Sequence, residues 1–196
     1  MTASVTPGLA QEVAAAVDQL RRVTVQVRMR GAAMGAGVLW EGGLVITNAH
    51  VVRGDQATIE LSDGTVGRGR IVARDLKRDL AALEVEPSPA LEPAVVRDSP
   101  PLRVGELVIA IGHPGGVVGA ATLGIVHVVE SEREGRAPRW IRADVRLAPG
   151  FSGGPLADAT GRLVGVNTMI HGGLALAVPA RAVEAWVRRA HAAVTP

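Results

Sequence analysis

Hydrophobic residues recur at helical spacing at both ends of the chain. Near the start they are Leu9, Val13, Ala16, Val17 and Leu20, and near the end they are Val183, Trp186, Val187, Ala190 and Val194. Each set falls on one face of a helix with 3.6 residues per turn. Pro7 suits the first helical position, where a missing N–H removes no hydrogen bond. The pattern therefore predicts helices over residues 1–22 and 181–196.

Between these helices the hydrophobic pattern is typical of short strands. Val23, Val25, Val27 and Met29 alternate with polar residues, which predicts a half-buried strand. Further apolar runs span residues 37–40, 44–47, 57–61, 80–85, 107–111, 121–129, 139–145 and 163–167. Glycine and proline residues separate the runs, as they do in turns between strands. The chain is therefore predicted to be all-β, a barrel or a sandwich.

Prolines gather between residues 86 and 104 and divide the strands into two comparable sets. This division predicts an organisation of five segments. They are an N-terminal helix at 1–22, a first set of strands at 23–95, a linker at 96–104, a second set of strands at 105–180 and a C-terminal helix at 181–196.

The composition supports a folded core and excludes several kinds of chemistry. Of the 196 residues, 47% are hydrophobic and 20% are charged, which argues against disorder. Because the chain has no cysteine, it holds no disulfide scaffold, no thiolate metal site and no cysteine nucleophile. The net charge is only +2, and three Trp and one Phe offer few stacking platforms, so we expect no nucleic-acid partner.

The sequence shows no targeting or membrane segment. No stretch approaches the roughly 18 apolar residues that a membrane span requires. The early apolar run at residues 13–17 is too short for a signal peptide and follows no basic residue. We therefore expect a cytoplasmic protein without a membrane partner.

Three polar residues lie in settings that favour chemistry. His50 follows an apolar strand, and Asp79 opens another. Ser152 lies in the segment Pro149-Gly150-Phe151-Ser152-Gly153-Gly154-Pro155, whose glycines allow a sharp turn that exposes the hydroxyl and lets the amides of Gly150 and Ser152 converge on one point. Alone, each feature is more often structural: a lone histidine, a strand cap or a glycine-rich turn.

Two other aspartates compete with Asp79 for a role in this chemistry. Asp63 precedes Gly64, a pair that is typical of a hairpin turn. Asp75 lies in a polar stretch before the apolar run begins. Asp79 is therefore the favoured acid.

The order of these motifs resembles the chymotrypsin-like serine peptidases, and specifically the protease domain of the HtrA/Deg family. The resemblance covers roughly residues 23–183. The matching segments are Gly35–Leu39, Gly43–Val52, Leu61–Gly64, Asp79–Leu83, Asp98–Ser99, Leu102–Glu106, Ala110–Pro114, Ser152–Leu156 and Val164–Thr168. So many segments in one order make chance agreement implausible.

The resemblance implies two six-stranded Greek-key β-barrels with short terminal helices, and a triad in the cleft between the barrels. Ser152 would attack a peptide carbonyl, His50 would accept the proton, and Asp79 would orient the imidazole. The amides of Gly150 and Ser152 would form the oxyanion hole. The implied activity is a serine endopeptidase acting on polypeptides, unfolded proteins included. It needs no metal or organic cofactor, and the sequence leaves the oligomeric state undetermined.

The resemblance also places the substrate. Its side chain would lie against Leu147, Ile170 and His171, and its backbone would pair with residues 168–170, that is Thr168, Met169 and Ile170. Digestive relatives that cut after Lys or Arg carry an acid six residues before the serine, where this chain has Arg146. We therefore expect cleavage after Val, Ile, Ala or Leu, and repulsion of basic residues by Arg146.

Some features depart from the family pattern. Phe151 stands where the family usually has Asn, and its bulk could hold the Gly150 amide away from the oxyanion. The alternative is therefore a peptidase-like fold that binds or scaffolds with little turnover. A basic nucleic-acid or membrane-surface module would rest only on Arg181, Arg188 and Arg189, which are typical of a solvated helix face. We expect no PDZ domain, because no residues follow Pro196 in this sequence.

Overall fold

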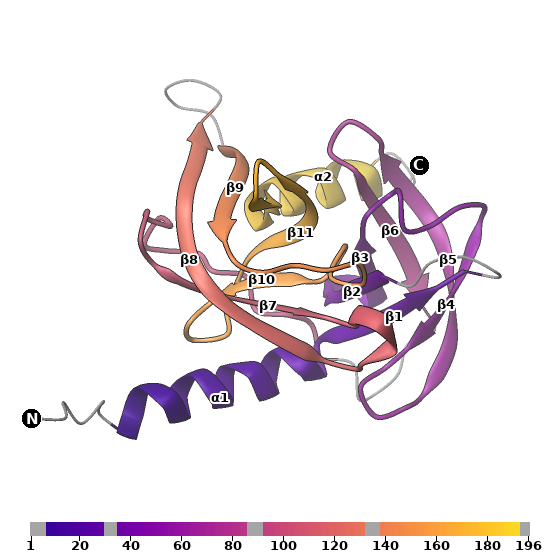
Figure 1. Ribbon diagram of the computed structural model, residues 1–196. Helices are drawn as coiled ribbons and strands as arrows, with labels where there is room; N and C mark the ends of the chain where they lie inside the picture. The colour runs from indigo at the N-terminus through magenta and orange to yellow at the C-terminus, as the bar shows by residue number, and fades with distance from the viewer. Residues whose placement is uncertain (1–6, 30–34, 86–91, 132–137, 193–196) are drawn as a thin grey trace, which may run out of the picture.

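The computed structural model describes residues 7–29, 35–85, 92–131 and 138–192. Within them, two closed antiparallel barrels of six strands each are flanked by two helices (Figure 1). The first barrel contains β1 (Thr24–Arg28), β2 (Gly35–Trp40), β3 (Leu44–Thr47), β4 (Gln56–Glu60), β5 (Val66–Asp75) and β6 (Leu80–Val85). The second contains β7 (Leu107–Gly112), β8 (Ala120–Ser131), β9 (Pro138–Asp144), β10 (Pro155–Asp158), β11 (Leu163–His171) and β12 (Leu174–Pro179). The predicted fold class is confirmed.

The two barrels share one topology. Around the first barrel the strands run β1-β2-β3-β6-β5-β4, and the second repeats this order when its strands are counted from β7. In each closed barrel every strand has a hydrogen-bonded neighbour on both sides. The loops at the barrel ends are then free to carry the functional residues.

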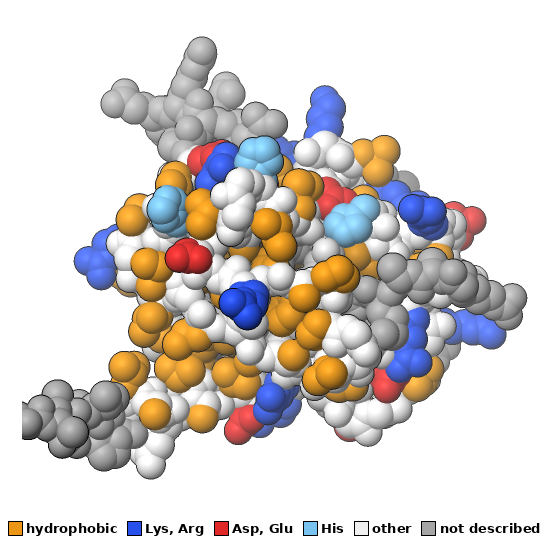
Figure 2. Space-filling model, viewed as in Figure 1, with side chains coloured by type: hydrophobic (Ala, Val, Ile, Leu, Met, Phe, Trp, Pro, Cys, Tyr) orange, Lys and Arg blue, Asp and Glu red, His pale blue; other side chains and the backbone are white. Residues whose placement is uncertain are grey.

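Helix α1 (Pro7–Arg22) begins at the predicted proline and uses only part of its apolar face. Ala16 and Leu20 are buried in an apolar cluster that contains residues of both barrels, whereas Leu9 is 46% exposed. Figure 1 shows the N-terminal half of α1 projecting away from the barrels, and Figure 2 shows hydrophobic side chains exposed over α1 and the adjoining part of β8. Residues 1–6 and 193–196, with Val194 of the predicted second helix, lie outside the described residues.

Strand β1 is more deeply buried than its alternating pattern predicted. Its polar residues Thr24 and Gln26 are only 1% and 2% exposed, because β1 is covered on both faces, by α1 and β7 as well as by the barrel interior. Their polar groups are paired: Thr24 Oγ1 donates to the Leu20 carbonyl at 2.7 Å, and Gln26 accepts from Arg28 Nε at 2.6 Å. The prediction of a half-buried strand was therefore wrong.

Helix α2 (Ala180–Ala192) joins the two barrels through a shared apolar cluster. Its residues Val183, Trp186 and Val187 are buried, as the sequence predicted. They belong to one cluster with Ile46 of β3 and Val166 of β11, so the helix packs against both barrels at once. This packing fixes the relative position of the loops that meet between the barrels.

The proline-rich connection is attached to the second barrel by a buried arginine. Arg97 is 8% exposed, and its backbone N–H donates to the Leu163 carbonyl at 2.9 Å. Its guanidinium pairs with Glu106 at 2.6 Å and lies 3.7 Å from Asp158. The Arg97 hydrogen bond, acting against burial, lowers the pKa of Glu106 to about 2. This stretch of the linker is thus part of the folded unit.

Candidate active site

Asp79 sits in a backbone conformation that few non-glycine residues adopt. It directly precedes β6 and has φ at 56°, in the left-handed region. Two hydrogen bonds from the first barrel hold Asp79 in this conformation. The Asp79 carbonyl accepts the Ala49 N–H at 3.2 Å and the Asn48 side-chain amide at 2.9 Å. The loop after β3 thus holds the loop before β6. No pattern in the sequence indicates this role of Asn48.

The Asp79 carboxylate holds His50 by two hydrogen bonds. Asp79 Oδ1 accepts the His50 backbone N–H at 2.9 Å, and Asp79 Oδ2 lies 2.6 Å from His50 Nδ1. Because a carboxylate only accepts, Nδ1 carries the proton and Nε2 keeps its lone pair. The imidazole is about half exposed, with 51% of the side chain accessible, so Nε2 can face a substrate.

A third donor reaches Asp79 from the other barrel. Thr168 Oγ1, on β11, donates to Asp79 Oδ2 at 2.6 Å. Burial acts to raise the pKa of Asp79, but the hydrogen bonds from His50 and Thr168 outweigh it and hold the pKa below its ordinary value. Thr168 was predicted only as a substrate contact, and no local pattern reveals a bond between residues 89 positions apart.

Ser152 comes from the second barrel but is attached to the first. Its carbonyl accepts the Ala36 N–H of β2 at 2.8 Å. Gly153 is required beside it, since a Cβ there would lie 2.2 Å from both the Ala36 carbonyl and Thr47 Oγ1. The Ser152 hydroxyl donates to the Thr168 carbonyl at 3.1 Å, so it must rotate to face His50. Catalytic hydrogen bonds of this kind are often completed only when substrate binds.

The residues before Ser152 form a tight turn with glycine at its third position. Phe151 N–H donates to the Ala148 carbonyl at 3.1 Å, and Gly150 has φ at 109°. This combination is typical of a type II turn, which requires a positive φ at that position. Within the described part of the chain, the N–H groups of Gly150 and Ser152 donate to no other backbone group.

The side chain of Phe151 points away from this turn. It is 3% exposed and packs in the core of the second barrel with residues that include Val108 and Leu156. The phenylalanine therefore fills the barrel interior behind the turn, and its bulk does not lie where the amides of Gly150 and Ser152 converge.

An open apolar cleft of about 610 Å³ contains most of the predicted site residues. It is lined by His50, Leu76, Asp79, Leu147, Ala148, Pro149, Phe151, Ser152, Thr168, Met169 and Ile170. Leu76 was not predicted to line the site, because it lies in the polar stretch that contains Asp75. Met169 and Ile170 are 45% and 54% exposed, so their side chains are accessible from the cleft.

Two residues expected in the pocket are not in the lining. His171, at the exposed end of β11, pairs with Leu174 of β12. Arg146 is exposed, so the repulsion expected from it at the pocket base has no support in the structure. Both lie in or beside irregular turns, where counting along the sequence does not fix the direction of a side chain.

The competing aspartates hold local turns. Asp63 Oδ1 accepts the Thr65 N–H at 2.8 Å. Asp75 Oδ1 accepts the N–H groups of Lys77 and Arg78 at 3.0 and 3.1 Å. These are capping contacts, which leave Asp79 as the acid beside His50.

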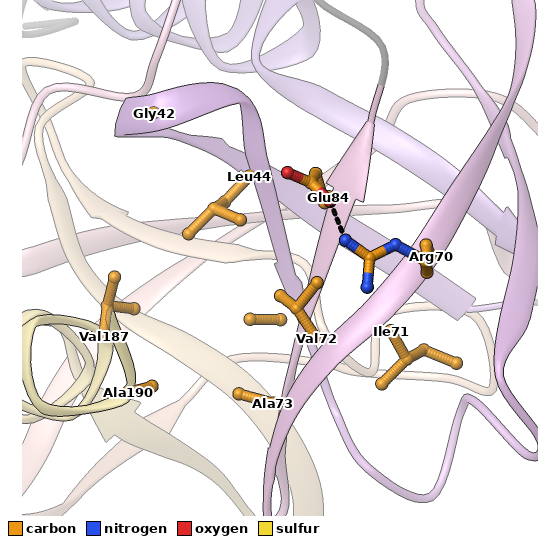
Figure 3. Close-up of a pocket in the computed structure, with 10 residues that line it drawn as sticks. Gly42, Leu44, Arg70, Ile71, Val72, Ala73, Glu84, Val187 and Ala190 are labelled. Carbon is orange, nitrogen blue, oxygen red and sulfur yellow. Dashed lines mark hydrogen bonds and ion pairs between the residues drawn. The ribbon is translucent and has the colours of Figure 1, made fainter. Parts of the chain in front are cut away.

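A second pocket, of about 350 Å³, lies between β5 and α2 (Figure 3). Its walls are apolar side chains such as Leu44, Val72 and Val187. Among the described residues that line it, the only charged ones are Arg70 and Glu84, which pair with each other. Unlike the cleft, this pocket does not place a nucleophile next to a base among its described lining residues.

Comparison with known proteins agrees with this geometry. The profile of the trypsin-like peptidase domain matches residues 35–166. The chain belongs to this family. It is 36% identical over 156 residues to a probable periplasmic serine endoprotease, DegP-like, of Halomonas elongata, a match that covers 74% of this chain and 32% of the relative. It is 37% identical over 145 residues to the chloroplastic Protease Do-like 1 of Arabidopsis thaliana, covering 70% of this chain and 33% of the relative.

A solved HtrA-type protease, AlgW with tripeptide, has the same fold. It superposes with a TM-score of 0.80 at 29% identity, over 90% of this chain and 62% of that one. The predicted resemblance to trypsin-like and HtrA peptidases is thereby confirmed. The chain spans about a third of the length of the curated relatives it matches.

The predicted cytoplasmic location is wrong. Several matched relatives are described as periplasmic and one as chloroplastic, which points away from the cytoplasm. The prediction rested on the first residues of a sequence that spans only part of such relatives, and these residues do not define a compartment. Among the described residues, no helix is long and apolar enough to cross a membrane.

Proposed function

We propose that this domain is a serine endopeptidase that hydrolyses unfolded polypeptides through Ser152, His50 and Asp79. The observation that carries the proposal is the imidazole of His50, fixed by Asp79 at 2.6 Å at the edge of the cleft that also holds Ser152. The fixed tautomer leaves Nε2 as the base, which is the arrangement that a serine nucleophile needs.

The reaction follows from these positions. Ser152 Oγ attacks the substrate carbonyl while His50 Nε2 takes its proton, and the amides of Gly150 and Ser152 donate to the new oxyanion. The C–N bond then breaks as His50 returns the proton to the leaving amine, which gives an acyl-enzyme. A water molecule then attacks the acyl carbon while His50 Nε2 takes one of the water protons. The bond between the acyl carbon and Ser152 Oγ breaks, His50 returns the proton to the serine, and the carboxylic acid product leaves.

The cleft favours an extended substrate. Residues 168–170 of β11 border it, so an unfolded chain can add as a strand along them. An open apolar cleft also suits the hydrophobic segments that unfolded proteins expose, which supports the substrate class proposed here. The alternative, a binding module without turnover, loses its basis because the Phe151 side chain is buried away from the oxyanion turn.

Cleavage is expected after Val, Ile, Ala or Leu. The apolar residues Leu147 and Ile170 line the cleft, and the only acid among the described lining residues, Asp79, is already engaged by His50 and Thr168. One methylene more or less in such a pocket changes binding by only about 1–3 kcal/mol, so discrimination among these residues should be loose. Mass spectrometry of the fragments of a denatured protein measures the preference.

A charged variant sharpens this test of specificity. Leu147→Asp should move cleavage toward Lys and Arg, whereas the neutral Leu147→Asn should not. A majority of cuts after Lys or Arg by the parent protein would show that these residues do not form the pocket.

Activity is expected to fall in acid because His50 must be neutral. A protonated imidazole cannot accept the proton of Ser152, so kcat/KM should fall as the pH is lowered into the acid range. The Asp79 carboxylate does not contribute to this fall, since its hydrogen bonds, acting against burial, keep its pKa below the ordinary value. An activity maximum near pH 4 would instead indicate paired carboxylates.

A further inference from the structure

A second histidine, His113, lies beside the oxyanion turn and takes no part in the triad. It follows the last residue of β7 and is 2% exposed. Its Nε2 is buried and makes no hydrogen bond of normal geometry among the described residues. An unpaired buried polar atom lowers the stability of the fold, so the presence of a histidine here calls for another role of its side chain.

The other ring nitrogen of His113 accepts a backbone hydrogen bond. Gly119 N–H donates to His113 Nδ1 at 3.2 Å, across the loop between β7 and β8. Nδ1 can accept only when it carries no proton, so the imidazole is the neutral Nε2–H tautomer. Burial, assisted by the charge of Arg28, lowers the pKa of His113, although the Val25 carbonyl acts in the opposite direction.

The backbone of His113 holds the turn that precedes Ser152. His113 N–H donates to the Gly150 carbonyl at 2.9 Å. The packing is tight, since a Cβ on Gly150 would lie 2.6 Å from the His113 carbonyl oxygen. Any movement of residue 113 is therefore transmitted directly to Gly150.

Helix α1 supports the same loop from the other side. Arg21 Nε donates to the Gly119 carbonyl at 2.8 Å. The continuous path of hydrogen bonds runs from Arg21 to Gly119, from Gly119 to the His113 ring, and from the His113 backbone to Gly150. Figure 1 shows the C-terminal end of α1 passing beside the start of β8, where this path begins.

We propose that His113 is a positioning residue for the oxyanion hole: its imidazole fixes the β7–β8 loop through Gly119 so that its backbone N–H holds Gly150 in the turn that presents its amide to the substrate. The inference rests on the catalytic role proposed for Gly150 and Ser152. It assigns no contact with substrate to His113.

Two variants of His113 separate its acceptor atom from its bulk. His113→Leu introduces an apolar side chain of similar size and leaves the Gly119 N–H unpaired. His113→Asn carries an acceptor oxygen the same number of bonds from the backbone as Nδ1. We expect His113→Leu to lower kcat by about tenfold to a hundredfold, less than the loss of a whole oxyanion donor, with KM nearly unchanged. His113→Asn should retain most of the parent kcat.

The helix contact gives a matched pair of variants. Arg21→Ala removes the donor to Gly119, whereas Arg22→Ala makes the same charge change at the exposed neighbouring position. Arg21→Ala should lower kcat in the same direction as His113→Leu, and Arg22→Ala should not. Affinity for a substrate peptide, measured by fluorescence anisotropy in a Ser152→Ala background, should not change with His113→Leu.

The experiment combines these kinetics with a measurement that does not depend on activity. In protein labelled with 15N-histidine, NMR at pH 7.5 should show His113 as the neutral Nε2–H tautomer. An Nδ1–H tautomer would overturn the inference, and so would a folded His113→Leu with parental kcat or a His113→Asn as impaired as His113→Leu. Failure of the proposed function has a different signature: the parent protein itself would not react with a fluorophosphonate.

Discussion

Replacement of Ser152 by alanine is expected to lower kcat on a peptide substrate by on the order of a millionfold. The serine supplies the atom that forms the acyl-enzyme. Among the described residues that line the cleft, the other hydroxyl belongs to Thr168, and its Oγ1 donates to Asp79. His50→Ala should cost nearly as much, and the double variant little more than either, because nucleophile and base act as one unit. Degradation of casein, measured from released peptides, gives the rates.

An exposed serine elsewhere provides the control. Ser62 lies in the turn between β4 and β5, and Ser62→Ala should retain the parent rate. Ser152→Ala should also melt near the parent temperature, because the hydroxyl makes only one hydrogen bond, to the Thr168 carbonyl, within the described residues. Casein degradation by Ser152→Ala at the parent rate would overturn the triad.

Gly150→Ala is expected to lower kcat by on the order of a hundredfold to a thousandfold, as the loss of one oxyanion donor does. Alanine is excluded there for two reasons. The φ of 109° is strained for a residue with a Cβ, and that Cβ would lie 2.6 Å from the His113 carbonyl oxygen. The turn must therefore rearrange, and its central peptide, which carries the Gly150 N–H, must rotate. The kinetic constants on a chromogenic peptide measure the loss, which should fall mainly on kcat.

Gly64→Ala separates backbone strain from the effect on the oxyanion hole. Gly64 also has a positive φ, 85°, but open space surrounds its Cβ position and it lies in a turn of the first barrel. This variant should lose about 1–2 kcal/mol of stability, the ordinary cost of a left-handed residue, and keep its kcat. If Gly150→Ala stayed folded and turned over like Gly64→Ala, the Gly150 amide would have no part in the reaction.

Much of the fold was predictable because each barrel is built from short apolar runs that glycine and proline interrupt. The runs at residues 44–47, 80–85 and 107–111 correspond to β3, β6 and β7. Strand β5 was missed, since the exposed and charged part of VGRGRIVARD shows no clear period of two. Strand β10 was also missed, because the proline and aspartate at the ends of PLAD leave it no apolar run. Its register is fixed by neighbours on both sides, β7 and β11, which are distant in sequence.

The parts of the site that short sequence motifs mark were predictable, whereas the contacts between the two barrels were not. The flanking sequences singled out His50, Asp79 and Ser152, and the structure brings all three to one cleft. The support that Thr168 gives to Asp79 joins the two barrels, so only the assembled fold reveals it. Phe151 was ambiguous for the same reason, because its direction, into the second barrel, depends on the turn at Gly150.

Reaction with a fluorophosphonate tests the central claim most directly, since such a probe forms a covalent bond only with a serine activated by a base. Intact-mass measurement of the parent protein at pH 8 should show a single adduct, and peptide mapping should place it on Ser152. Ser152→Ala should not react, and His50→Ala should react far more slowly than the parent. A folded parent protein that gains no adduct, or gains one at another serine, would contradict the assignment of Ser152, His50 and Asp79 as the catalytic triad.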